Sequence, residues 1–267
     1  MGGGGLAAEF GTTARPASLK TPDGLTDGKK YPLIMVLHGF GVTGLTQSAY
    51  LGASALPGRD EAFVIAPDGT VNNNGMQFWN ADPACCDLNG QNPDDVGYLG
   101  GMLDDILATD WPIDPGRVFV IGHSNGGFMA YRMACERADI VAAVMSLAGL
   151  AASTPTSCMP DQPVNVLQAH GTADGTVPYA YMGFGAEPTV AQWAGYNGCS
   201  GTTRTPGTTA DFDGSIAGSE TTQSSTQGCP DGGAADLWKL TGSGHIPNLT
   251  ADFTSAMLAW LVDHSRS

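Results

Sequence analysis

The pentapeptide Gly122-His123-Ser124-Asn125-Gly126 places a serine between two glycines, after a mostly apolar run at 117–121. That run has the bulky, β-branched character of a buried strand, and residues 128–136 continue without glycine or proline, as a helix would. A tight turn between strand and helix holds a serine hydroxyl clear of the sheet, and the flanking glycines let the helix pack back. The free N–H groups at the start of the helix point at the same place. The pattern therefore predicts that Ser124 is a nucleophile.

A serine hydroxyl reacts readily only when a base takes its proton, and a histidine oriented by a carboxylate is the usual base. Four of the five histidines have other expected roles. Two end predicted strands as turn residues, one points away inside the turn around Ser124, and one is solvated near the C-terminus; these are His38, His170, His123 and His264. His245 remains, in a glycine-rich loop after the last predicted strand. We predict that His245 is the base, against the alternative of an ordinary surface histidine.

Asp174 is the predicted carboxylate. It precedes a glycine just beyond the strand predicted at 164–169, and the alternative is a simple turn residue. Catalytic groups of open α/β sheets gather at the carboxyl ends of strands, and Ser124, Asp174 and His245 follow strand ends in the chain order of the α/β-hydrolases. An oxyanion hole is predicted at two backbone N–H groups, those of Asn125 and of Phe40 after the first predicted strand.

These residues need a framework of strands and helices. Apolar runs predict buried parallel strands at 31–37, 63–66, 117–121, 140–147 and 164–169, and an alternating run predicts a last strand at 235–240. Helices are expected around 47–55, at 125–137, 188–197 and 250–264, and in a run that begins at Asp94 and Asp95. For these two aspartates, an N-cap and a favourable interaction with the helix dipole are preferred over metal binding. Residues 198–234 are predicted to be an irregular excursion that a disulfide between Cys199 and Cys229 holds in place. The link after Leu147 is too short for a sizeable lid.

The composition narrows the class of protein. A net charge of −15 and a pI near 4.3 disfavour nucleic acid or an anionic membrane as a partner. No run of about 18 apolar residues predicts a membrane span. The low charged fraction of 14% and the even number of cysteines favour a secreted protein with up to three disulfides, against buried free thiols. A monomer is expected. Fifteen pairings remain open for Cys85, Cys86, Cys135, Cys158, Cys199 and Cys229.

The N-terminal segment is set apart from the fold. Residues 1–10 are glycine-rich, lack the basic and apolar regions of a signal peptide, and are interpreted as an expression scar. The expected location is extracellular, with the signal peptide absent from this sequence. The remaining residues, 11–267, are predicted to form a single α/β domain.

Taken together, these motifs resemble secreted α/β-hydrolase esterases of the polyhydroxybutyrate-depolymerase and feruloyl-esterase type. The matching stretches are Leu37-His38-Gly39-Phe40-Gly41, Phe78-Trp79-Asn80-Ala81 with Cys85-Cys86, Asp94-Asp95-Val96-Gly97-Tyr98-Leu99, Gly122-His123-Ser124-Asn125-Gly126-Gly127-Phe128-Met129, His170-Gly171-Thr172-Ala173-Asp174 and Gly244-His245. The resemblance implies a mostly parallel eight-stranded sheet with helices on both faces, and cofactor-free hydrolysis of carboxylic esters by Ser124, His245 and Asp174. One departure is Ile246-Pro247, where the group often has Trp-Pro, so the substrate wall beside the base is expected to differ.

Several functions remain as hypotheses. The leading one is a serine esterase acting on short-chain or aryl esters, or on polyesters such as polyhydroxybutyrate and aromatic polyesters. Trp79 and Phe40 are predicted apolar walls of an open cleft, with core packing as the equal alternative for Trp79. A feruloyl or acetyl-xylan esterase is the main alternative, followed by a peptidase and a non-catalytic binding protein. A metal enzyme is disfavoured because Cys85-Cys86 lacks zinc spacing and 211–214 lacks the full calcium-loop pattern.

Overall fold

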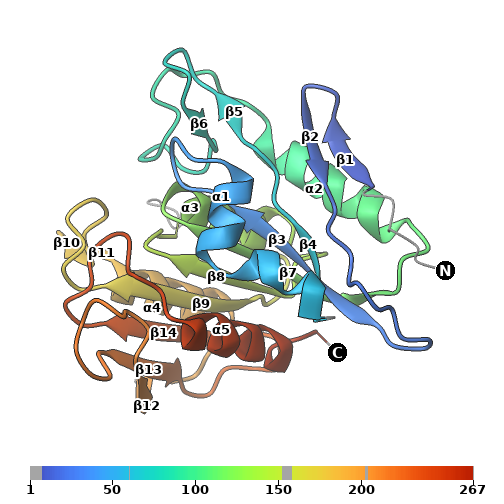
Figure 1. The fold of residues 1–267 in the computed structure, drawn as a ribbon. Helices are drawn as coiled ribbons and strands as arrows, with labels where there is room; N and C mark the ends of the chain where they lie inside the picture. Colours follow the sequence, from blue (N-terminus) through green and yellow to red (C-terminus); the bar gives the residue numbers. More distant parts are fainter. Residues whose placement is uncertain (1–7, 60, 152–157, 202–203, 267) are drawn as a thin grey trace.

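The computed structural model describes residues 8–59, 61–151, 158–201 and 204–266. Its central element is an eight-stranded sheet in the order β12-β13-β14-β9-β8-β7-β3-β4 (Figure 1). The strands are β3 (Tyr31–Leu37), β4 (Phe63–Ile65), β7 (Ile113–His123), β8 (Ala143–Leu147), β9 (Asn165–Gly171), β12 (Arg204–Ala210), β13 (Thr221–Thr226) and β14 (Ala235–Leu240). Neighbours from β4 to β14 are parallel, and β12 and β13 add an antiparallel edge. The predicted mostly parallel α/β-hydrolase sheet is confirmed.

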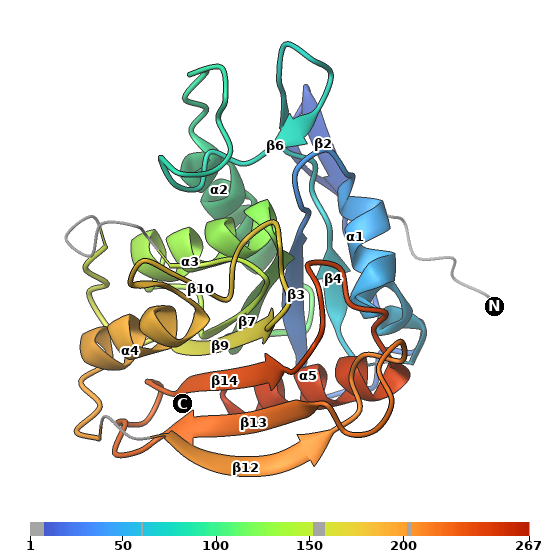
Figure 2. The ribbon, with the colours of Figure 1, turned by 90° about the vertical axis from the view of Figure 1, so that its left-hand side faces the viewer.

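Five helices cover the two faces of the sheet. They are α1 (Gly44–Tyr50), α2 (Asp95–Leu107), α3 (Asn125–Glu136), α4 (Ala186–Tyr196) and α5 (Ala251–Asp263). Helices α2, α3 and α4 lie on one face and α1 and α5 on the other (Figure 2). Along β3, Leu33 and Met35 join the core under α2 and α3, whereas Ile34 and Val36 join the core under α5. Alternate side chains of a strand face opposite ways, so a strand with both faces covered is apolar throughout.

Short elements join this framework at its edges. The 3₁₀ helices η1 (Ala53–Ala55) and η2 (Pro57–Arg59) follow α1. Three small hairpins pair β1 (Glu9–Thr12) with β2 (Arg15–Ser18), β5 (Thr70–Val71) with β6 (Gln77–Phe78), and β10 (Ala180–Tyr181) with β11 (Phe184–Gly185). Hairpin β1–β2 includes Glu9 and Phe10, the last two residues of the segment set apart in the sequence. These two residues therefore belong to the fold, while residues 1–7 lie outside the described part of the chain.

The start of α2 was predicted in part. Asp94 is the N-cap, with its side chain accepting from the Gly97 N–H at 2.8 Å, as expected. Asp95 does more than favour the helix dipole, because it is fully buried and its Oδ1 lies 2.7 Å from Arg15 Nη1. No sequence pattern indicates this partner, which is 80 residues earlier in the chain.

The prediction of an irregular excursion at 198–234 is wrong, because this segment contains β12 and β13. Glycine, serine and threonine obscured the strands, which form the polar edge of the sheet and need no apolar run.

The Cys199–Cys229 disulfide is present, together with Cys85–Cys86 and Cys135–Cys158, so the prediction of three disulfides is confirmed. The predicted absence of a lid concerns a link whose residues 152–157 lie outside the described residues. Within the described ranges, no helix is long and apolar enough to cross a membrane.

The Cys199–Cys229 disulfide closes a loop with a sequence separation of 30. Replacing both residues with serine is expected to lower the stability by about 3 kcal/mol, because the unfolded chain regains the entropy of the open loop. Thermal unfolding should show a Tm lower by roughly 5–12 °C. The matched control is Cys85→Ser with Cys86→Ser, whose disulfide joins adjacent residues and closes no such loop. Equal losses in the two double variants would contradict the loop-entropy explanation.

Candidate active site

Ser124 occupies a turn that only glycine neighbours allow. It lies between the end of β7 and the start of α3, with φ 54° and ψ −122°, which is unfavourable for a residue with a side chain. A Cβ on Gly122 would lie 2.2 Å from the carbonyl oxygen of Gly126, and a Cβ on Gly126 would lie 2.1 Å from that of Leu37. The Ser124 N–H donates to the Leu147 carbonyl at 2.8 Å, which ties the turn to β8. The two glycines are therefore required by backbone contact.

The structure brings the three predicted residues into contact. Ser124 Oγ lies 2.9 Å from His245 Nε2, and His245 Nδ1 lies 2.7 Å from Asp174 Oδ2. The residues follow β7, β9 and β14, and the carboxyl ends of these parallel strands meet at one edge of the sheet. Asp174 is buried, whereas the His245 side chain is 14% exposed and Ser124 is partly exposed. The hydroxyl is thus open to a ligand while the carboxylate behind it is not.

The Asp174 carboxylate is surrounded by hydrogen-bond donors. Oδ1 accepts from the N–H groups of Thr176 and Val177, each at 2.8 Å, and Oδ2 faces ring nitrogens of His245 and, at 3.3 Å, His170. Burial favours the neutral acid, but these hydrogen bonds outweigh burial and hold the pKa of Asp174 well below its usual value. An ionised Asp174 can only accept, so His245 carries its proton on Nδ1 and presents the Nε2 lone pair to the serine hydroxyl. Asp174 therefore accepts the turn hydrogen bonds and also contacts the imidazole of His245, and its catalytic role stays a prediction.

One predicted oxyanion donor, the Phe40 N–H, belongs to a turn that packs against the serine. Gly39 packs against Ser124, since a Cβ on Gly39 would lie 3.5 Å from the serine Cβ. The Gly39 N–H donates to Gln47 Oε1 at 3.1 Å, and the Gly41 N–H donates to the Gln77 carbonyl at 2.8 Å. Within the described part of the chain, no acceptor engages the N–H of Phe40 between them.

The Asn125 N–H is likewise without an acceptor in the described ranges, since it belongs to the first residue of α3. Neither predicted donor is engaged by an acceptor in these ranges, and their role in an oxyanion hole stays a prediction.

Comparison with known proteins places this geometry in a family. The family model described as "Putative esterase" matches residues 12–232, most of the chain. The chain belongs to this esterase family. Feruloyl esterase B of Piromyces equi is 28% identical over 250 residues, which cover 86% of this chain and 42% of that protein.

Two further similarities agree with this family. Poly(3-hydroxyalkanoate) depolymerase C of Paucimonas lemoignei is 29% identical over 175 residues, covering 64% of this chain and 37% of that protein. The chain thus spans less than half the length of these two curated relatives. Among solved structures, an acetyl xylan esterase from Aspergillus awamori superposes with a TM-score of 0.67 at 18% identity, covering 97% of this chain and 99% of that one. At this identity the structural likeness shows the fold alone.

Three residues outside the predicted site hold the loop that carries His245. His123 Nε2 lies 2.8 Å from the His245 carbonyl, and the Tyr50 hydroxyl donates to the Pro247 carbonyl at 2.8 Å. Burial lowers the pKa of His123 to about 4, so at neutral pH it is an uncharged N–H donor. The sequence predicted only that His123 points away from Ser124. Its position in the turn gave no sign that it anchors the loop of the base.

Asp213 is the third anchor of this loop. Its Oδ1 accepts from the Asn248 N–H at 3.1 Å, and its Oδ2 accepts from the Ser243 hydroxyl. Asp213 is buried, which by itself raises the pKa of a carboxyl, but the bonds from Ser215, Ser243 and Asn248 lower it below the usual value. The segment considered as a calcium loop in the sequence instead binds the His245 loop. Within the described ranges, no group of three or more histidine, cysteine or acidic residues is placed to hold a metal ion.

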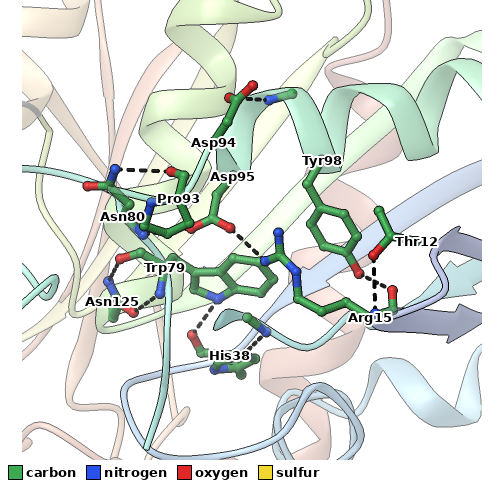
Figure 3. A network of polar contacts seen from close by, with 12 residues as sticks. Thr12, Arg15, His38, Trp79, Asn80, Pro93, Asp94, Asp95, Tyr98 and Asn125 are labelled. Atoms are coloured by element: carbon green, nitrogen blue, oxygen red, sulfur yellow. Dashed lines mark hydrogen bonds and ion pairs between the residues drawn. The ribbon is translucent and has the colours of Figure 1, made fainter. Parts of the chain in front are cut away.

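Trp79 is not a wall of the cleft, contrary to one of the two predictions made for it. It is fully buried, and its backbone exchanges two hydrogen bonds with the side chain of Asn125, at 2.7 and 2.9 Å (Figure 3). Its indole N–H donates to the His38 carbonyl at 3.0 Å. The alternative prediction of core packing is confirmed, because an indole enclosed on all sides cannot contact a substrate.

The network around Trp79 continues to the N-terminal hairpin (Figure 3). The Asn80 N–H donates to Asp95 Oδ2 at 2.8 Å, and Asp95 Oδ1 pairs with Arg15. Burial raises the pKa of Asp95, although the bonds from Asn80 and Arg15 oppose this shift. A buried carboxylate with both oxygens bonded fixes the loop before α2 relative to the residue that follows the nucleophile.

Ile246 and Phe40 are the remaining predicted substrate contacts. Ile246 follows the base directly and is 69% exposed, and Phe40 is partly exposed. Ile246 is next to His245 in the chain, and Phe40 follows Gly39, which packs against Ser124. Their role as apolar walls stays a prediction.

Asp213→Asn is expected to lower the stability by about 2 kcal/mol at pH 7, because the neutral amide accepts the loop hydrogen bonds less strongly than a carboxylate does. A carboxyl whose pKa is lower in the folded state stabilises the fold above its unfolded pKa, and this contribution is lost as the pH falls. The difference in Tm between the variant and the parent should therefore be clear at pH 7 and small at pH 3. The control is Asp211→Asn, an exposed carboxylate two residues earlier. A Tm difference that is the same at both pH values would contradict the assignment.

Proposed function

We propose that this protein hydrolyses carboxylic esters through a covalent acyl intermediate on Ser124. The observation that carries the proposal is the continuous line of hydrogen bonds from Asp174 through His245 to Ser124, at 2.7 and 2.9 Å. Family membership supports the same reaction class. A nucleophile, a base and a carboxylate in this order can transfer one proton back and forth during acyl transfer.

Each step uses a group whose position is known. Ser124 Oγ attacks the ester carbonyl carbon while His245 Nε2 takes the hydroxyl proton, and the N–H groups of Phe40 and Asn125 stabilise the resulting oxyanion. The tetrahedral intermediate collapses as His245 gives this proton to the departing alkoxide, which leaves as an alcohol. Water then attacks the acyl-serine with His245 again as base, and the second collapse restores the serine and releases the acid. Asp174 stays ionised and holds the imidazole.

The proposed substrates are esters of bulky or polymeric acids. Relatives named as a feruloyl esterase and a poly(3-hydroxyalkanoate) depolymerase support aryl esters and polyesters. The exposed Ile246 beside the base also suits an apolar acyl or alcohol group. An extracellular site of action fits the three disulfides, which persist in oxidising surroundings.

Ser124→Ala tests the mechanism directly. With p-nitrophenyl acetate or butyrate as substrate, kcat/KM is expected to fall by at least about 10³-fold, because the nucleophile is gone while the fold remains. Ser255→Ala, at an exposed serine of α5, is the control and should keep full activity. A fluorophosphonate probe should label the parent protein at Ser124 and leave the alanine variant unlabelled. Undiminished turnover by the alanine variant would overturn the proposal.

Gln47→Leu tests the oxyanion assignment. Buried Gln47 holds the Gly39 N–H, so its loss should let the turn shift and misdirect the neighbouring Phe40 N–H. We expect kcat to fall by roughly 10- to 100-fold with KM little changed, since the donor acts mainly in the transition state. Thr46→Ala, at an exposed position of the same helix, serves as control. A Gln47→Leu enzyme with normal kcat would remove Phe40 from the proposed oxyanion hole.

Substrate preference is tested by comparing methyl ferulate, a series of p-nitrophenyl esters of increasing acyl length, and a polyester suspension. Release of soluble monomers from the suspension is expected. Activity confined to soluble short esters would contradict the polymer proposal while leaving the mechanism intact.

A further inference from the structure

A line of buried polar contacts other than those of His245 leads to Asp174. It begins in α3, where the Tyr131 hydroxyl lies 2.8 Å from Gln168 Oε1. Gln168 Nε2 lies 3.0 Å from His170 Nδ1, and His170 Nε2 lies 3.3 Å from Asp174 Oδ2. Gln168 and His170 are completely buried, and Tyr131 is nearly so. None of these side chains has a part in the proposed mechanism.

Two backbone carbonyls fix the direction in which each bond is donated. Gln168 Nε2 lies 2.8 Å from the Gly149 carbonyl, and since a carbonyl can only accept, the amide nitrogen must face it. The amide oxygen therefore faces Tyr131 and accepts its proton. The second amide hydrogen faces Nδ1 of His170 at 3.0 Å, with the Ala169 carbonyl farther away at 3.4 Å, so Nδ1 accepts through its lone pair.

The contacts of the other ring nitrogen of His170 independently indicate that Nδ1 is unprotonated. His170 Nε2 lies 2.8 Å from the Val177 carbonyl, so Nε2 must carry the proton. An imidazolium would need a second proton on Nδ1, where an amide N–H already points. The ring is therefore neutral, and its single N–H lies between the Val177 carbonyl and Asp174.

We propose that His170 is a positioning residue, a neutral imidazole whose Nε2–H is donated to the Val177 carbonyl and also faces Asp174 Oδ2 at 3.3 Å, where it holds the carboxylate in line with His245. This inference rests on the proposed function, because it assigns a task within that site. With this donor in place, Oδ2 is shared by two imidazoles and the carboxylate cannot rotate without losing one of them. Without the His170 N–H, more of the negative charge of Asp174 is available to His245 and stabilises the imidazolium form of His245. The carboxylate is also freer to rotate, so it orients the imidazole less well.

The other ionisable groups near these imidazoles leave the assignment unchanged. The ring centroids of His123, from β7, and His245 are 4.9 Å apart. Burial lowers the pKa of His123 to about 4. The ring of Tyr179 packs edge-on against that of His170, with 5.7 Å between the ring centroids. Nζ of Lys239, from β14, lies 5.5 Å from the centroid of the Tyr179 ring. Lys239 is also the register partner of His170 across β14 and β9, and its ammonium lies over the Tyr179 ring.

The first test reads the tautomer directly and requires no turnover. Long-range proton–nitrogen NMR of the Ser124→Ala protein should show the nitrogen shift of a protonated Nε2 and an unprotonated Nδ1 for His170 from pH 5 to 8. A proton on Nδ1, or a charged ring within this range, would overturn the proposal.

The second test compares variants in the same Ser124→Ala background. His170→Leu removes the donor and should raise the pKa of His245, followed by NMR, by about 0.5–1 unit. His170→Gln keeps an amide N–H that can replace the donor and should restore most of the parent value. The matched control is Asn165→Leu, at a buried and hydrogen-bonded residue of β9 at the opposite end of the strand.

With Ser124 present, His170→Leu should lower kcat by roughly 10- to 100-fold and His170→Gln by less. An unchanged His245 pKa in His170→Leu, or an equal shift in Asn165→Leu, would overturn the proposal and identify a general packing effect. Both results are independent of whether Ser124 is the nucleophile, since that question is decided by the activity of Ser124→Ala alone.

Discussion

The buried and ionised carboxylate of Asp174 is the group on which the arrangement of the site depends. A carboxylate removed from water keeps its charge only if hydrogen-bond donors replace the lost water. The turn after β9 supplies two backbone N–H groups to one oxygen, and imidazole nitrogens face the other. This requirement fixes the turn at Thr176 and Val177. It also requires that the strand preceding the His245 loop lie beside β9, which is the position of β14 in the sheet.

The second constraint is the backbone conformation of Ser124. An unfavourable φ persists only where the surrounding contacts leave no alternative. Those contacts come from β8, through the Leu147 carbonyl, and from the paired hydrogen bonds between Asn125 and Trp79. The Trp79 segment is in turn bound to Asp95 and Arg15, so a hairpin at the N-terminal end of the described chain supports the residue that follows the nucleophile.

The sequence predicted the parts of this site that depend on local pattern. Continuous apolar runs located the buried strands, and glycines located the Ser124 turn, because both are direct consequences of backbone sterics and burial. The sequence did not reveal the pairing of Asp95 with Arg15 or of His123 with the His245 carbonyl, since each partner is distant in the chain. The contacts of His170 are with nearby residues, but which ring nitrogen faces which partner depends on how the turn after β9 folds back. Trp79 illustrates the limit, because its residue type suits a substrate wall and a core equally and only its surroundings decide. The strands at 204–210 and 221–226 were missed because an exposed edge strand does not need an apolar pattern.

The polar edge of the sheet also accounts for the order of the His245 loop. The connection between β12 and β13 carries Asp213, whose carboxylate binds the loop through Ser243 and Asn248, while Tyr50 and His123 bind its carbonyls from the other side. Each anchor comes from a different element, and each would leave a buried polar group without a partner if the loop moved. Such losses add up for any displacement, so the imidazole is held near the serine before a substrate arrives. Because the imidazole is already oriented in the folded protein, no entropy has to be lost to orient it during the reaction. A base on a surface loop can therefore be positioned as accurately as one on a strand.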